Sequence, residues 1–233
     1  MATIIGNIQQ VHARIAAACT TAQRPVQSVT LLVVGKTFGP DALAQAFDAG
    51  ERQFGENYVR EGLDKIAALA HLRRDIEWHL IGPLQSNKTR EVATQFDWVH
   101  SIDRLKIAQR LSEQRPAHLP PLQVCLQVNI SGESSKSGVS VDEVSGLAHA
   151  VARLPRLALR GLMAIPQPAG DLTAQRQPHA ALRGLLQRLQ REGLALDTLS
   201  MGMTADLEAA VLEGATIVRV GTAIFGGRTP VFG

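Results

Sequence analysis

The sequence predicts a (β/α)8 barrel of the TIM type, in which eight parallel strands alternate with helices in one α/β domain. Three observations predict it. Short aliphatic runs alternate with longer segments whose apolar residues recur at helical spacing. Eight such runs occur, and the length of 233 residues is close to the roughly 250 residues usual for this barrel. A doubly wound open sheet gives the same alternation, so the pattern alone leaves that alternative open.

The first predicted element is an extra helix over residues 4–19, ahead of the first strand. The predicted strands are the aliphatic runs at 29–36, 52–57, 76–82, 98–102, 122–129, 157–165, 196–202 and 216–222. The predicted helices are 40–49, 58–72, 87–96, 104–114, 141–154, 173–192, 204–214 and a short turn at 223–226. Pro40 near the start and Gly50 just past the end of one helix show the usual asymmetry of helix termini. Because no linker or repeat interrupts the series, one domain over residues 1–233 is expected.

The composition excludes several classes of protein. With 45% hydrophobic and 19% charged residues, the chain resembles an ordinary globular protein. No run reaches the roughly 18 apolar residues of a membrane span, and the N-terminus lacks the apolar core of a signal peptide. A cytoplasmic protein is therefore expected, with no membrane partner. Cys19 and Cys125 lie far apart, form no metal-type pair and are expected to be small apolar side chains.

The charge balance is mildly basic, with a net charge of +3 and a pI of about 9.2. The arginines are scattered along amphipathic helices, and aromatic residues make up 4% of the chain. That leaves little surface on which bases could stack. No nucleic-acid partner is expected, and a monomer is expected rather than an oligomer.

A lysine stands at the end of the first predicted strand, in the run LLVVGKTFG. Lys36 shares a strand face with Val34 and Leu32, so its side chain is expected to point into the barrel mouth. Functional residues of such barrels lie at the C-terminal ends of strands. A lysine that extends from a strand end into solvent is the alternative.

Two loops could bind a phosphate, and they follow the seventh and eighth strands, where barrels of this kind usually bind one. The first is SMGMTADLEAA. Ser200 offers a hydroxyl, Gly202 permits close backbone approach, and Thr204 is expected to be the N-cap of the next helix, whose free N–H groups attract anions.

The second loop is VRVGTAIFGGR. Gly221 and Thr222 open a short helix, and Arg219 lies on the same side of its strand as Gly221. An inward arginine needs an anion or another acceptor. A lysine facing a phosphate site suggests a Schiff base with a phosphorylated aldehyde, and pyridoxal 5′-phosphate is such a molecule.

The ordered motifs GKT, FGENYVRE, WHLIGPLQSNK, KSG, GLMAI, SMGMTADLEAA and VRVGTAIFGGR resemble the pyridoxal phosphate homeostasis protein family, also called the proline synthetase co-transcribed homologue family. The resemblance covers nearly the whole chain. It implies a barrel like the N-terminal domain of alanine racemase. It also implies that Lys36 carries pyridoxal 5′-phosphate as an internal aldimine.

The resemblance further implies which residues surround the cofactor. It places Ser200, Gly202, Gly221 and Thr222 at the phosphate, Arg219 near the pyridine nitrogen, and Asn57 at the mouth. It implies a role in vitamin B6 and amino-acid homeostasis without robust turnover, with apo-enzymes as recipients of the cofactor.

Two positions depart from the pattern of the family. Gly35 stands where serine often precedes the lysine, and this glycine is expected to loosen the end of the strand without removing the Schiff base. Thr204 stands where serine is usual in the SMGMS motif. Because threonine keeps the hydroxyl, phosphate binding there is still expected.

Other residues have ordinary explanations. His79, within the third strand, is interpreted as a hydrogen-bonded core residue, and the seven histidines show no metal-binding spacing. Lys88 and Lys136 lie in predicted loops at the same end as Lys36. They are interpreted as solvated, with added positive potential or receipt of the cofactor as the alternative.

Three other functions remain as alternatives. An amino-acid racemase needs an acid or base on each face of the substrate. The alanine racemase type takes a tyrosine from a second domain, whereas this sequence ends at Gly233 and has Tyr58 as its one tyrosine. An aldolase would use the lysine and phosphate loops on a sugar phosphate. An RNA-binding protein would need no small ligand.

Overall fold

The structure, a computed structural model, describes residues 3–132 and 137–226. Within these ranges eight strands form a closed barrel in chain order, and every neighbouring pair is parallel. They are β1 (Thr30–Val34), β2 (Gln53–Glu56), β3 (Glu77–Leu80), β4 (Trp98–Ile102), β5 (Leu122–Gln127), β6 (Leu157–Met163), β7 (Thr198–Ser200) and β8 (Ile217–Val220). Pairing of β1 with β8 closes the ring and sets Leu32 opposite Arg219. The predicted barrel is confirmed and the open sheet is excluded.

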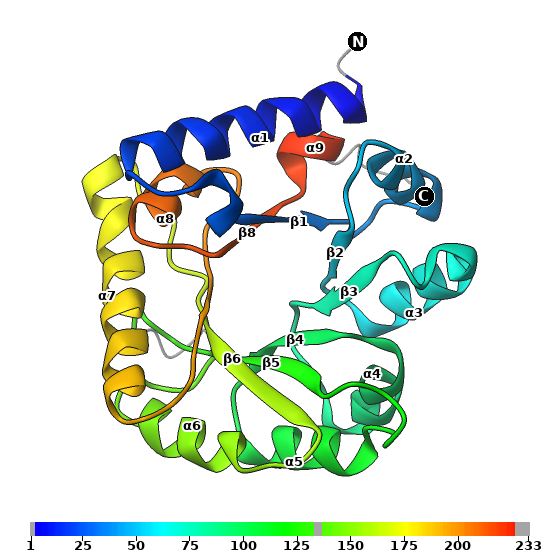
Figure 1. The fold of residues 1–233 in the computed structure, drawn as a ribbon, viewed down its shortest axis with the longest axis vertical. Helices are drawn as coiled ribbons and strands as arrows, with labels where there is room; N and C mark the ends of the chain where they lie inside the picture. Colours follow the sequence, from blue (N-terminus) through cyan, green and yellow to red (C-terminus); the bar gives the residue numbers. More distant parts are fainter. Residues whose placement is uncertain (1–2, 133–136, 227–233) are drawn as a thin grey trace.

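Helices surround the barrel, as Figure 1 shows. They are α1 (Ile4–Thr21), α2 (Pro40–Asp48), α3 (Val59–Ala68), α4 (Thr89–Gln95), α5 (Leu105–Gln114), α6 (Val144–Ala152), α7 (Leu172–Arg191), α8 (Leu207–Leu212) and α9 (Thr222–Phe225). The extra N-terminal helix is confirmed as α1, which packs across α8 and α9. None of the described helices combines the length and apolar character that a membrane crossing needs. The predicted single domain, over residues 1–233, extends beyond the described ranges.

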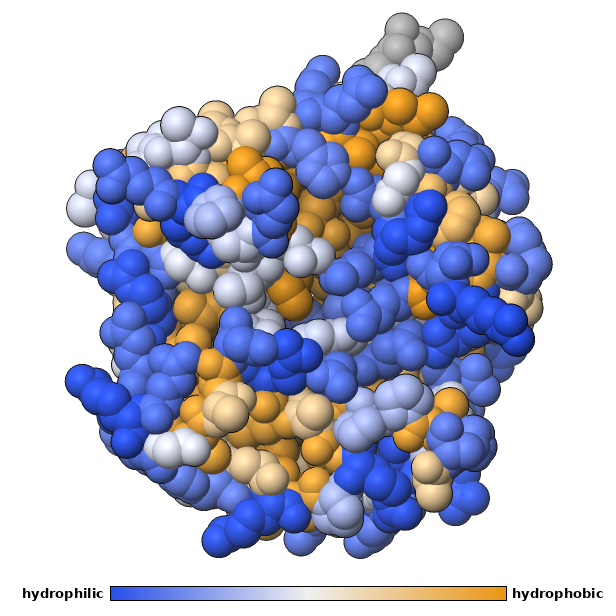
Figure 2. All heavy atoms as spheres, in the orientation of Figure 1, coloured by the Kyte–Doolittle hydropathy of each residue, from blue (hydrophilic) through white to orange (hydrophobic). Residues whose placement is uncertain are grey.

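Alternation along the strands divides the apolar residues between two places. Leu31 and Val33 of β1 join the large core between the strands and the helices. Leu32 and Val34 point the other way and pack in a separate cluster inside the barrel, with Ile81 and Ile217. Figure 2 shows that hydrophilic residues cover most of the outer face in view, with apolar residues in patches between them.

The first strand ends earlier than the sequence predicts. Residues 29–36 were expected to be extended, but β1 ends at Val34. The Gly35 N–H still donates to the Gly55 carbonyl at 3.0 Å, whereas the Gly35 carbonyl accepts a bond from the Phe38 N–H at 3.0 Å. The chain therefore turns at Gly35, and Lys36 lies in the turn rather than in the sheet.

Candidate functional site

Six of the eight residues predicted from the sequence to bind the cofactor lie in segments that follow strands at one end of the barrel, and the other two, Ser200 and Arg219, lie within β7 and β8. Because the strands are parallel, the segments that follow β1, β2, β7 and β8 emerge at the same mouth. The predicted residues are Lys36, Asn57, Ser200, Gly202, Thr204, Arg219, Gly221 and Thr222. The structure thus brings together residues up to 186 positions apart, from Lys36 to Thr222.

Lys36 has a free amine. Its side chain is half-buried, and among the described residues its Nζ has no hydrogen-bond or ion-pair partner. The next residue, Thr37, has a φ of 70°, a left-handed conformation that is unfavourable for a β-branched residue. The Glu61 carboxylate accepts the Thr37 N–H at 2.5 Å and so holds this turn in place.

A second lysine lies directly behind the turn. Lys65 of α3 is 4% exposed. Its Nζ donates to the Gly35 carbonyl at 2.7 Å, to Glu56 Oε1 at 2.8 Å and to Glu61 Oε1 at 2.7 Å. These three acceptors use all the donors of an ammonium group. Lys65 therefore fixes the carbonyl that precedes Lys36 and has no proton left to donate to a ligand.

The end of β2 carries two buried oxygen atoms without partners in the described part of the chain, Glu56 Oε2 and Asn57 Oδ1. Burial raises the pKa of Glu56 to about 7, against the opposing effect of the Lys65 charge. An unpaired buried acceptor is costly unless a ligand or water satisfies it. Asn57 thus has an acceptor that a ligand at the mouth can use.

The two predicted phosphate loops meet at their threonines. Thr204 Oγ1 lies 3.1 Å from Thr222 Oγ1. Gly202 has a φ of 89°, and a Cβ there would lie 2.4 Å from the Ala210 Cβ. A Cβ at Gly221 would lie 2.8 Å from the Val34 carbonyl oxygen. Glycine is therefore required at both positions, and each glycine lies within two residues of one of the two threonines.

The predicted N-cap role of Thr204 is wrong. The helix begins only at Leu207, with Asp206 at the cap position, and it has six residues. Asp206 Oδ1 accepts the Met203 N–H at 2.7 Å, while its Oδ2 lies 2.9 Å from His179 Nε2. The Asp206 N–H, one of those that a Thr204 cap would accept, donates to the Met203 carbonyl at 3.3 Å instead, and the Thr204 hydroxyl lies against Thr222.

Helix α1 supports both threonine turns from outside the barrel. Arg14 donates to the Thr204 carbonyl at 2.8 Å and to the Glu208 carboxylate at 2.7 and 2.8 Å. The Asn7 amide donates to the Ile224 carbonyl at 2.7 Å. The backbone around Thr204 is therefore held by α1 and α7 without any ligand. Sequence reasoning missed this role of α1.

Ser200 is placed deeper than the other predicted phosphate residues. It is fully buried, and its Oγ accepts a hydrogen bond from Arg219 Nη1 at 2.8 Å and lies 2.8 Å from His100 Nδ1. Arg219 also donates from Nη2 to the Ala164 carbonyl at 2.9 Å, and burial lowers its pKa to about 10. The predicted contact of Ser200 with a phosphate stays a prediction, and the contact with Arg219 was not foreseen.

The remaining predicted residues have simpler environments. His79 is fully buried and hydrogen-bonded to His100 at 2.9 Å, which confirms its interpretation as a core residue. Lys88 is 40% exposed and pairs with Glu91 at 3.2 Å. Lys136 lies outside the described residues. In the described part of the chain no group of three or more His, Cys, Asp or Glu side chains could hold a metal ion.

Comparison with known proteins places the chain in a family. The family model described as alanine racemase, N-terminal domain, matches residues 7–229. A pyridoxal phosphate homeostasis protein of Pseudomonas aeruginosa is 59% identical over 228 residues, covering 98% of this chain and 97% of the relative. One of the same name from Escherichia coli is 54% identical over 233 residues, covering 98% of each chain.

The chain belongs to the pyridoxal phosphate homeostasis protein family. A solved structure of PipY from Synechococcus elongatus, with PLP bound, superimposes with a TM-score of 0.80 at 36% identity, over 93% of this chain and 100% of PipY. The family membership predicted from the ordered motifs is confirmed.

Removal of the buried ammonium tests its structural role. We expect Lys65→Met to lower the free energy of unfolding by about 3 kcal/mol, because Glu56 would keep a buried carboxyl without its cation. Urea denaturation at neutral pH measures the change. The control Lys88→Met removes an exposed pair and is expected to cost less than about 1 kcal/mol. Equal effects of the two changes would contradict the assignment.

The raised pKa of Glu56 predicts a pH dependence of stability. Between its ordinary value of 4.5 and about 7, the folded protein keeps a proton that the unfolded chain has lost. This contribution to stability is complete below pH 4.5 and is lost as the pH rises through about 7. Relative to Glu56→Gln, the wild type should lose on the order of 3 kcal/mol across this window. Urea denaturation from pH 4.5 to 8 checks the slope, and parallel curves would refute it.

Proposed function

We propose that this chain binds pyridoxal 5′-phosphate (PLP) at the barrel mouth and holds it on Lys36 through a Schiff base. Its role would be to keep the reactive aldehyde available for vitamin B6 and amino-acid homeostasis and for apo-enzymes, without robust turnover. The observation that carries the proposal is the free amine of Lys36 at the same mouth as the paired Thr204 and Thr222 hydroxyls. The family relatives named for PLP support it.

The residues present fit this cofactor. A phosphate needs hydrogen-bond donors and close backbone approach, which the threonine pair and the constrained glycines supply. The ring nitrogen needs a polar partner, and Arg219 is a buried cation whose contacts to Ser200 and Ala164 leave further N–H donors. Asn57 adds a buried acceptor without a partner in the described structure.

When bound, PLP supplies an aldehyde that condenses with amines and a ring that accepts electrons. The protein decides how far this chemistry proceeds. With a pKa of about 10, Arg219 stays charged at neutral pH and offers donors alone. A guanidinium at the ring nitrogen therefore disfavours protonation of that nitrogen, which weakens the ring as an electron acceptor. This supports a role in holding the cofactor.

A racemase needs a second acid or base opposite Lys36. The one tyrosine of the sequence, Tyr58, is 58% exposed and precedes α3. An exposed ring is a poor second acid or base for a buried site, and this supports a carrier. The expected monomeric state and cytoplasmic location also stay proposals.

The Schiff base is tested by absorbance and mass mapping. Purified protein with added PLP should show a visible band that borohydride removes, leaving a pyridoxyl mass on the peptide containing Lys36. Lys36→Ala should lose both signals because the free amine is gone, while Lys88→Ala should keep them. A pyridoxyl mass elsewhere, or none, would reject the assignment of Lys36.

The same PLP-loaded preparation tests turnover. Alanine incubated with it in D2O is expected to keep its Cα hydrogen and its configuration at rates near those of free PLP. Rapid exchange or racemization would replace the carrier with an enzyme.

The threonine pair is tested with two aldehydes that differ only in the phosphate. We expect Thr204→Val and Thr222→Val each to weaken PLP binding by roughly 10- to 100-fold, the range for a hydrogen bond to a charged group. Binding of pyridoxal, which lacks the phosphate, should change little. Absorbance titration measures both. Equal losses for the two aldehydes would mean that the hydroxyls support the fold rather than the phosphate.

A further inference from the structure

A line of polar groups crosses the barrel interior from the mouth to the opposite end. It runs from Arg219 of β8 through Ser200 of β7 and His100 of β4 to His79 and Glu77 of β3. The contacts measure 2.8, 2.8 and 2.9 Å down to His79 Nδ1. His79 Nε2 then lies 3.6 Å from Glu77 Oε2, an electrostatic contact that is long for a hydrogen bond. The other four members are at most 4% exposed, and Glu77 is 40% exposed.

The mouth end sets the direction of the donors. An arginine can only donate, so Ser200 Oγ accepts from Arg219. The buried hydroxyl proton of Ser200 then needs an acceptor, and in the described structure the one beside it is His100 Nδ1 at 2.8 Å. His100 accepts on Nδ1 and must carry its own proton on Nε2, which faces His79 Nδ1. His79 in turn carries its proton on Nε2.

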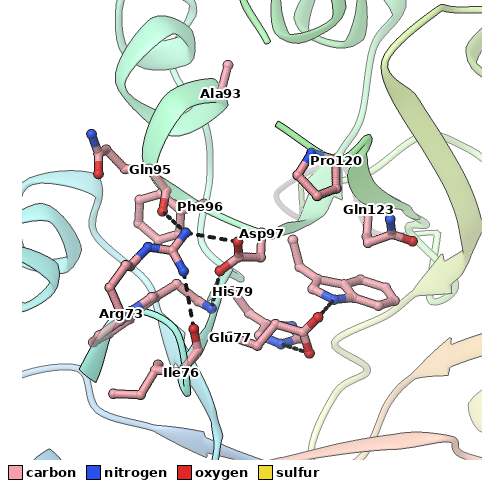
Figure 3. A network of polar contacts seen from close by, with 12 residues as sticks. Arg73, Ile76, Glu77, His79, Ala93, Gln95, Phe96, Asp97, Pro120 and Gln123 are labelled. Carbon is pink, nitrogen blue, oxygen red and sulfur yellow. Dashed lines mark hydrogen bonds and ion pairs between the residues drawn. The ribbon is translucent and has the colours of Figure 1, made fainter. Parts of the chain in front are cut away.

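The Glu77 end of the line independently indicates the same direction of hydrogen-bond donation. His79 Nε2 faces a carboxylate oxygen of Glu77, which can only accept when ionised. The Trp98 indole N–H donates to the other carboxylate oxygen at 2.9 Å, and its ring stacks on His79 with centroids 5.3 Å apart. Figure 3 shows the Glu77 carboxylate beside the ring of His79. The opposite tautomers would set two acceptors against each other here.

Burial supports neutral rings throughout the line. Desolvation is the largest effect on both histidines, and it lowers the pKa of His79 and lowers that of His100 well below the ordinary value. The pKa of Glu77 is lowered, first by its contact with His79. A neutral histidine has one donor and one acceptor nitrogen, so each ring passes the direction of the line onward.

We propose that Ser200, His100 and His79 form a directed hydrogen-bond chain that fixes the guanidinium of Arg219. The Glu77 carboxylate, in electrostatic contact with His79 Nε2, sets the direction of the chain, so all four are positioning residues. The chain holds both histidines as Nε2–H tautomers and ends at the Glu77 carboxylate, on the barrel end away from the mouth. That Arg219 then presents its remaining donors to the ring nitrogen of PLP rests on the proposed function. Among the described residues, no other contact at the mouth depends on the Glu77 carboxylate at the opposite end of the barrel.

Substitution of Glu77 should reverse the chain. In Glu77→Gln, the amide oxygen takes the Trp98 N–H and the amide nitrogen faces His79 Nε2. His79 Nε2 must then accept a hydrogen bond from the amide, so the His79 proton moves to Nδ1. His100 follows in the same sense and directs an N–H toward Ser200, which would then accept from both Arg219 and His100 and leave its own buried hydroxyl proton without an acceptor. A neutral change at the far end of the barrel thus disturbs the group at the mouth.

The test reads the tautomers directly. Long-range 1H–15N spectra of histidine-labelled wild type at neutral pH, without added PLP, should show His79 and His100 as neutral Nε2–H tautomers, with signals assigned by His79→Gln and His100→Gln. Glu77→Gln should show Nδ1–H for both rings. Glu113→Gln, an exposed carboxyl on α5, should change neither. Histidine rings that are charged, or protonated on Nδ1, in the wild type would overturn the proposed chain. This outcome is read from the wild type alone, so it stands even if a variant does not fold.

PLP titration tests the link to Arg219. Ser200→Ala and Glu77→Gln should each bind PLP roughly tenfold more weakly, as expected when a charged group loses a hydrogen-bonded support, and should shift its visible band. Glu113→Gln should match the wild type. Unchanged binding and band in both variants would overturn the link. Failure of the wild type to bind PLP would reject the proposed function instead, and the tautomers would still decide the chain.

Discussion

A guanidinium buried inside the barrel, that of Arg219, dictates how the rest of the interior is composed. A buried charge costs several kcal/mol unless hydrogen bonds compensate for it. Ser200 and the Ala164 carbonyl provide them, and the histidines continue the polar line across the interior. Apolar side chains pack beside this line, among them the cluster that includes Leu32 and the ring of Trp98, which stacks on His79. The interior therefore contains a polar line, whereas such barrels usually fill it with branched aliphatic side chains.

The need to compensate a buried charge also determines the structure on the other side of the mouth, where it leaves a second amine without a partner. Lys65 is saturated by two carboxylates and a carbonyl, whereas Lys36, in the turn that Lys65 holds, has no partner in the described structure. The strained Thr37 backbone between them persists because Glu61 accepts its N–H. One buried ammonium thus stabilises the conformation that leaves the other amine available.

Sequence reasoning succeeded where the signal was local or ordered along the chain. Alternating periodicity gave the barrel, and the rule for strand ends located Lys36 and Arg219. It failed where a contact joins distant segments. Lys65 lies four residues after Glu61, a spacing that reads as an ordinary surface pair, and only the fold reveals its burial. Thr204 resembled an N-cap because the local sequence does not show that the helix begins only at Leu207, with Asp206 at the cap position.

Contacts within the protein itself organise the mouth. This bears on whether a bound cofactor is held or chemically transformed. Contacts from α1, α3 and α7, outside the mouth, fix both threonine turns and the Lys36 turn. Little ordering is then needed on binding, which favours affinity. In the proposed complex, the cation at Arg219 would oppose protonation of the ring and so limit its use as an electron sink. If the cofactor binds as proposed, strong positioning combined with a weakened electron sink would favour reversible storage over catalysis.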